Sequence, residues 1–181
     1  KPVDTRALPL DRLDEIVAAV SRALNAGAKV YWVCPLVEAS EAVDLEAATT
    51  RHRVLQKVFG QRVGLVHGRL KPAEKDRVMA AFAAGELSIL VSTTVIEVGV
   101  DVPNASIMVI EHAERFGLSQ LHQLRGRVGR GAVASVCVLL YTAPLSPTAK
   151  DRLRAMAETS DGFEIAHRDL EIRGPGEFMG A

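Results

Sequence analysis

This chain of 181 residues contains only two cysteines and few aromatic residues, and its formal net charge is zero. Each of the two cysteines, Cys34 and Cys137, lies in an apolar run, so both are expected to be small buried hydrophobic residues. Two cysteines without a cluster of histidines do not make a zinc site, and no other metal site is predicted. The formal net charge of zero gives no argument for nucleic-acid binding, so any such argument depends on local clusters of charge.

Long apolar runs and two common phosphate-binding motifs are also missing. Without a signal peptide or a long apolar stretch, we expect neither export nor a membrane partner, and we favour a reducing cytoplasm. No Gly-x-x-x-x-Gly-Lys-Ser/Thr loop occurs, so the chain has no phosphate loop of that type for ATP. No Gly-x-Gly-x-x-Gly follows a strand, which argues against a dinucleotide-binding oxidoreductase. We expect the chain, which starts at Lys1, to be a piece of a longer protein.

Short apolar runs alternate with amphipathic segments along most of the chain. Residues 1–9 are expected to be an irregular lead, and strands are expected at 30–34, 62–67, 88–92, 106–110 and 134–141. The segments between them contain helical patterns, for example one that begins at Pro72 and ends at Gly85. This alternation predicts an α/β fold, an open parallel sheet with helices on both faces. After Pro144, two helical stretches predict a C-terminal hairpin outside the sheet.

Unusual polar residues follow several of the expected strands. The loops at the carboxyl ends begin near Pro35, His67, Ser92 and His112, and ligands of open parallel sheets bind at that edge. Hydroxyl groups and backbone N–H groups in residues 92–101 could hold a phosphate without reading base sequence. The alternative interpretations are a hydroxyl-capped helix start for this segment and an ordinary loop histidine for His67.

Three arginines and three glycines fall within residues 123–131, which we call the arginine turn. Arginine has a permanent charge and a planar fork of donors that suits phosphate oxygens. Arg127 and Arg130 are three residues apart, so on one helical turn they share a face, whereas Arg125 points elsewhere. The alternative is a surface turn that pairs with carboxylates.

Residues 92–103 and the arginine turn together resemble motifs V and VI of superfamily 2 helicases, which belong to the second RecA-like domain. Residues 31–36, 67–82, 111–117 and 169–178 are similar, within that superfamily, to the bacterial helicases that act on branched DNA. The resemblance covers nearly the whole chain. It implies a RecA-like fold of the P-loop NTPase type over residues 1–144, and over residues 145–181 a helical hairpin for translocation that is truncated at its C-terminal end.

The resemblance also implies roles for individual residues. It directs Arg127 and Arg130 at the γ-phosphate of ATP as catalytic arginines, and it gives Gln123 a linking role. It places Gly99 and Asp101 beside the nucleotide. It assigns four residues to the DNA backbone: His67, Gly68, Thr93 and Thr94. It assigns three residues of the hairpin to coupling: Arg168, Arg173 and Glu177.

The function implied is that of the second motor domain of an ATP-dependent DNA helicase or translocase in DNA repair and recombination. ATP and Mg²⁺ would be bound mainly by the absent first RecA-like domain, which is one partner, and branched double-stranded DNA is the other. We therefore expect the chain alone to be inactive and monomeric, in the bacterial cytoplasm near the nucleoid. The alternatives are a transcription-repair coupling translocase and a non-catalytic, helicase-like scaffold.

Overall fold

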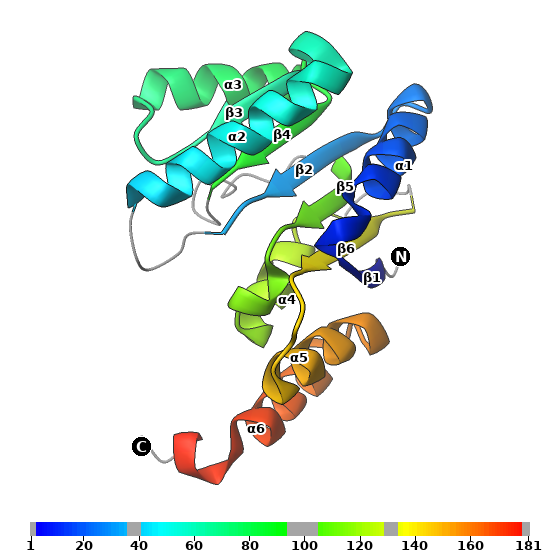
Figure 1. Cartoon of the computed structure of the whole chain (residues 1–181), viewed down its shortest axis with the longest axis vertical. Helices are drawn as coiled ribbons and strands as arrows, with labels where there is room; N and C mark the ends of the chain where they lie inside the picture. The colour runs from blue at the N-terminus through cyan, green and yellow to red at the C-terminus, as the bar shows by residue number, and fades with distance from the viewer. Residues whose placement is uncertain (1–2, 36–40, 94–104, 129–133, 179–181) are drawn as a thin grey trace.

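Six parallel strands form one sheet in the computed structural model, which describes residues 3–35, 41–93, 105–128 and 134–178 (Figure 1). The strands are β1 (Asp4–Pro9), β2 (Lys29–Val33), β3 (Val63–Val66), β4 (Ile89–Ser92), β5 (Ala105–Ile110) and β6 (Val136–Tyr141). Their order across the sheet is β1-β6-β5-β2-β4-β3, and every neighbouring pair is parallel. The five strands expected from the apolar runs are therefore confirmed.

The central strands are mostly apolar because both faces of the sheet are covered. All five residues of β2 are buried, and alternate residues enter different cores. Tyr31 and Val33 belong to one core, whereas Val30 and Trp32 belong to the other. This arrangement confirms the predicted open sheet with helices on both faces.

Helices α1 (Leu13–Asn25) and α2 (Glu41–Phe59) contribute to the core that contains Trp32. Helices α3 (Pro72–Ala84), α4 (Leu118–Arg125), α5 (Pro147–Glu158) and α6 (Gly162–Phe178) contribute to the core that contains Tyr31. Short 3-10 turns lie at η1 (Leu10–Arg12), η2 (Gly60–Arg62) and η4 (Ala113–Arg115). Pro72 begins α3 and Gly85, with a φ of 88°, ends it, as the sequence predicted.

The expectation of an irregular lead over residues 1–9 is wrong, because β1 pairs with β6 at the edge of the sheet. Asp4 and Arg6 are exposed and paired with each other at 3.1 Å, and only Thr5 in this strand is buried. The strand is therefore held by the backbone ladder to β6, in which Thr5 lies opposite Cys137, and not by a run of apolar side chains. An edge strand of this composition has no clear hydrophobic period.

The predicted C-terminal hairpin is present as α5 and α6. Ser146 Oγ accepts a hydrogen bond from the Ala149 amide at 3.0 Å, and Pro147 occupies the first turn of α5, as expected. The hairpin packs closely on the body of the fold, since Met156 of α5 and Ile165 of α6 belong to the core that contains Tyr31. Both cysteines are buried free thiols. Among the described residues, no helix combines the length and apolar character needed to cross a bilayer.

Candidate nucleic-acid and nucleotide-facing site

The carboxyl ends of four strands meet at one edge of the sheet. Val33 of β2 lies opposite both Ser92 of β4 and Ile110 of β5, and Val66 of β3 also lies opposite Ser92. The polar residues that follow these strands are therefore brought to a common edge, as the alternating fold predicted.

His67 and Thr93 are neighbours at this edge. The Thr93 amide donates a hydrogen bond to the Val66 carbonyl at 3.3 Å, which places the end of β4 beside His67. His67 Nδ1 accepts a hydrogen bond from the Arg69 amide at 3.2 Å. A Cβ atom added to Gly68 would meet nothing within 4 Å, so the backbone here is open to an approaching group. The structure thus brings together three of the four predicted DNA-contact residues, and the fourth, Thr94, lies outside the described residues.

Thr93 is also unusual in its hydrogen bonding. Its side chain is buried, with 3% of the residue exposed, and in the described part of the chain its hydroxyl oxygen has no hydrogen-bond partner. A buried polar group without a partner costs about 1–3 kcal/mol. The hydroxyl is covered in this state, so a ligand would have to uncover it before it could form a hydrogen bond.

Helix α4 and the turn that follows it present Gln123 and Arg127 on the surface, while apolar residues anchor the helix. Leu118, Leu121 and Leu124 are fully buried, whereas Gln123 is exposed and Arg127 is partly exposed. After α4, the Arg127 amide donates a hydrogen bond to the Leu124 carbonyl at 2.9 Å, which continues the helical turn. Three more residues were predicted to face the nucleotide, and all three lie outside the described residues: Gly99, Asp101 and Arg130.

Arg125, which sequence reasoning left without a role, is a buried link between α4 and two other elements. It is 3% exposed, and its Nη1 donates hydrogen bonds to the Met156 carbonyl at 2.7 Å and to Thr5 Oγ1 at 3.3 Å. Its Nη2 lies 3.2 Å from His122 Nδ1. The sequence did contain a signal for the burial of Arg125, because its spacing places it on the same helical face as Leu118 and Leu121.

The directions of the pKa shifts of Arg125 and His122 are consistent with this buried contact. Burial lowers the pKa of Arg125, but an arginine remains charged near neutral pH. Burial, followed by the nearby charge of Arg125, lowers the pKa of His122. A neutral His122 can accept a hydrogen bond from Arg125 through Nδ1, whereas a protonated ring cannot.

A second buried charge, Glu111, was also missed. Its carboxylate accepts hydrogen bonds from Trp32 Nε1 at 2.6 Å and from Arg51 at 2.6 Å and 2.9 Å, so it joins β5 to β2 and α2. Burial, followed by the charge of Glu111, raises the pKa of the Cys34 thiol well above its usual range. No sequence signal marked this pair, because Arg51 and Glu111 are far apart in the chain.

His112, just after β5, adopts a left-handed backbone with a φ of 49°. Its Nδ1 lies 3.2 Å from Thr142 Oγ1, and Thr142 in turn donates its amide to Glu114 at 3.1 Å. A non-glycine residue with positive φ is uncommon, although histidine tolerates it better than most. These contacts tie the end of β5 to the end of β6.

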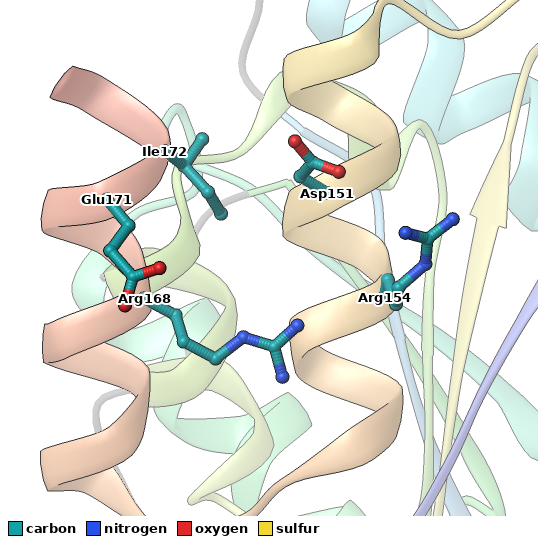
Figure 2. A pocket seen from close by; sticks show the side chains of 5 residues that line it. All are labelled: Asp151, Arg154, Arg168, Glu171 and Ile172. Atoms are coloured by element: carbon teal, nitrogen blue, oxygen red, sulfur yellow. The ribbon is translucent and has the colours of Figure 1, made fainter.

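The hairpin carries the residues that were predicted to act in coupling. Arg168 pairs with Glu158 at 3.0 Å, and Arg173 pairs with Asp169 at 3.2 Å, while the side chain of Glu177 lies outside the described residues. A pocket of about 230 Å³ opens between the two helices. Figure 2 shows the residues that line it: Asp151 and Arg154 on α5, and Arg168, Glu171 and Ile172 on α6. Its lining mixes charges of both signs, so it does not favour an anion over a cation.

No group of three or more potential metal ligands occurs among the described histidine, cysteine, aspartate and glutamate residues. The residues described at the ends of β3 and β4 instead offer hydroxyls, backbone amides, a histidine and an arginine, from Ser92, Thr93, His67 and Arg69. Such groups suit phosphate oxygens.

Comparisons with known proteins agree with one another. A family model described as "Helicase conserved C-terminal domain" matches residues 10–132. The chain is 59% identical, over 99% of its length, to the ATP-dependent DNA helicase RecG of Acidithiobacillus ferridurans and to that of Escherichia coli K12. It is 52% identical to the protein of the same name in Bacillus subtilis. The chain spans about a quarter (26%) of the length of these curated relatives.

Solved structures give the same picture. The structure of RecG bound to a three-way DNA junction matches 98% of this chain and 23% of its own, with a TM-score of 0.80 and 47% identity. The C-terminal domain of the DEAD-box protein Dbp5 matches 92% of this chain and 94% of its own, with a TM-score of 0.60 and 19% identity, which supports the fold alone. These likenesses confirm the predicted RecA-like fold.

Proposed function

Because the chain belongs to the family of helicase conserved C-terminal domains, we propose that it is the second motor domain of a RecG-type ATP-dependent DNA helicase. The full-length protein would remodel branched DNA, such as stalled forks and junctions, in repair and recombination. Its partners would be the first RecA-like domain of the same polypeptide and the DNA backbone. We further propose that it acts as a monomer in the bacterial cytoplasm.

The observation that carries this proposal is the meeting of β3 and β4 at the carboxyl edge of the sheet. His67, the open backbone at Gly68 and the buried hydroxyl of Thr93 lie together there. A phosphate oxygen would give the Thr93 hydroxyl the hydrogen-bond partner that it lacks among the described residues. Contacts of this kind position a strand without reading its bases, which suits a motor that must act on any sequence. Thr94 would extend the same set of contacts.

The arginine turn would complete a nucleotide site that belongs mainly to the first motor domain. The sequence has no phosphate loop, so ATP and Mg²⁺ would be held there, and ATP would supply the phosphoryl group that is transferred to water. Arg127 and Arg130 would stabilise the charge that develops on that group, an effect of roughly 10³ to 10⁵ in rate for well-studied arginine fingers. Gln123 would link the two domains, and Gly99 and Asp101 would lie beside the nucleotide.

The hairpin would couple closure of the nucleotide site to movement on DNA. We propose a division at residue 144, with residues 145–181 forming part of a translocation element that includes Arg168, Arg173 and Glu177. The bond from Arg125 to the Met156 carbonyl supports such coupling, because it joins the helix before the arginine turn directly to α5.

A transcription-repair coupling translocase is not favoured, because relatives that match over 99% of the chain, such as those of Acidithiobacillus ferridurans and Escherichia coli K12, are named RecG. A non-catalytic scaffold is a weaker explanation as well, because it would not require the arginine turn and the hydroxyls after β4 together.

The test is ATP hydrolysis by the full-length protein on forked DNA, with DNA affinity measured in parallel. We expect Arg130→Ala to lower hydrolysis by roughly two or more orders of magnitude while DNA still binds. Arg53→Ala, which removes an exposed arginine of α2, is the matched control and should leave hydrolysis unchanged. Hydrolysis that barely changes in Arg130→Ala would favour the scaffold. Turnover by the isolated 181-residue chain that Arg130→Ala abolishes would refute the claim that it holds only half of the site.

A further inference from the structure

The tip of the hairpin, residues 158–164, exposes an aromatic side chain almost completely. Phe163 is 90% exposed, whereas the other exposed large apolar side chains in the described part of the chain are at most 55% exposed. Fully burying a phenylalanine is strongly favourable, and aromatic residues are enriched in the centres of protein interfaces. An aromatic residue in this position is therefore a candidate anchor for a contact with another surface.

The tip is held by hydrogen bonds within its own turn and by a close approach to α4. The Phe163 amide donates a hydrogen bond to Asp161 Oδ1 at 2.9 Å, and the Asp161 amide donates to Thr159 Oγ1 at 3.1 Å. A Cβ atom added to Gly162 would lie 3.3 Å from His122 Nε2, so the tip is in close contact with α4. Because its backbone is already ordered, docking would cost little conformational entropy.

Charge around Phe163 indicates what kind of surface it fits. Glu158, Asp161 and Glu164 are exposed, and the tip contains no lysine or arginine, so its formal charge is three negative. Arg168 from the next turn of α6 neutralises only part of this charge through Glu158. A negative rim opposes close approach of DNA phosphates and favours a protein surface with lysines or arginines.

We propose that Phe163 anchors the hairpin tip in an apolar pocket with a basic rim on the first motor domain of the same polypeptide. The chain spans about a quarter (26%) of the length of its relatives, so in a protein of that length most of the polypeptide would be available to supply the surface that covers Phe163. The tip contacts α4, which also carries Gln123, and the proposed function directs this residue toward the first motor domain. The inference therefore rests on that function and adds a second contact between the two domains.

Photochemical cross-linking in the full-length protein tests the docking without relying on activity. The variant Phe163→p-benzoylphenylalanine is irradiated with and without forked DNA, and the cross-linked peptides are identified by mass spectrometry. We expect an adduct within the same molecule, in a segment of the first motor domain that combines apolar and basic residues. The same photoreactive residue in place of Val58, which is 55% exposed on α2, is the control and should not label that segment. An adduct with DNA, with a second protein molecule or only within residues 105–181 would overturn the proposal.

Hydrogen exchange then tests whether the aromatic ring itself holds the contact. Phe163→Ala should raise exchange in the cross-linked segment by about tenfold or more, on the scale of an interface hot spot. Phe163→Leu should raise it less, and the matched variant Val58→Ala should not change it. Equal exchange in all variants would overturn the role of Phe163. The outcome is separable from the proposed function, because the cross-link can form in a protein whose hydrolysis does not depend on Arg130.

Discussion

The buried arginine of α4 leads to a sharp prediction, since Arg125→Ala should destabilise the fold although the residue lies in a motif associated with catalysis. The substitution removes hydrogen bonds to the Met156 carbonyl, to Thr5 Oγ1 and to His122 Nδ1. Hydrogen bonds from a charged group contribute about 1.5–3 kcal/mol each. The loss is smaller than their sum, because the buried charge of Arg125 also loses its hydration on folding. We expect the free energy of unfolding to fall by about 2–4 kcal/mol.

The assay is urea unfolding followed by the fluorescence of Trp32, which is the only tryptophan and is fully buried. Arg125→Met, which keeps much of the volume but leaves the Met156 carbonyl unpaired, should cost about 1–3 kcal/mol, less than Arg125→Ala. The matched control is Arg154→Ala, an exposed arginine of α5, which should change stability by less than about 0.5 kcal/mol. If Arg125→Ala behaves like Arg154→Ala, the hydrogen bonds of Arg125 do not stabilise the fold and the reasoning is wrong.

Three further predictions concern other parts of the fold and use the same unfolding assay. Glu111→Ala should lower the free energy of unfolding by about 3 kcal/mol, because it leaves the partly buried Arg51 guanidinium without its carboxylate; a neutral effect would contradict this account. The pKa of His122 is lowered by burial from its usual 6.5, so the unfolded chain binds the proton more readily and stability should decrease as pH falls below 6.5. His122→Gln should remove that part of the pH dependence. Ser146→Ala should cost about 1 kcal/mol through loss of the helix cap, and an unchanged midpoint would count against the cap.

Much of the fold could be predicted because apolar runs, prolines and glycines act locally. The buried strands and the start of α3 at Pro72 followed directly from such signals. β1 could not be predicted in this way, because it is held by backbone hydrogen bonds to β6, a strand that is distant in the sequence. Glu111 and Arg51 were missed for a similar reason, since their contact depends on the three-dimensional arrangement of α2 and β5.

The location of the candidate site could be predicted, because the carboxyl ends of parallel strands lie at one edge of the sheet. His67 and Thr93 lie side by side because β3 and β4 are adjacent parallel strands. The alternating pattern predicts that the carboxyl ends of the strands share one edge, but it does not predict which strands are neighbours. The hydrogen-bonding state of the Thr93 hydroxyl could not be predicted, because it depends on burial by neighbouring segments. The exposure of Phe163 could not be predicted from the sequence either, since the helical pattern around it is typical of a residue that packs in a core.

Arg125 and Arg127 show why residue type alone does not give a role within a motif. Residues that are two positions apart on a helical turn differ by about 200° around its axis, so one side chain points out when the other points into the core. The structure accordingly buries Arg125 against α5 and leaves Arg127 partly exposed. In the proposed function, the two arginines would then have different tasks: Arg127 would face the nucleotide, and Arg125 would hold α4, the helix that precedes Arg127, against the hairpin. A substitution of Arg125 should therefore impair activity through stability and coupling, whereas a substitution of Arg127 should impair hydrolysis through the loss of its charge at the nucleotide.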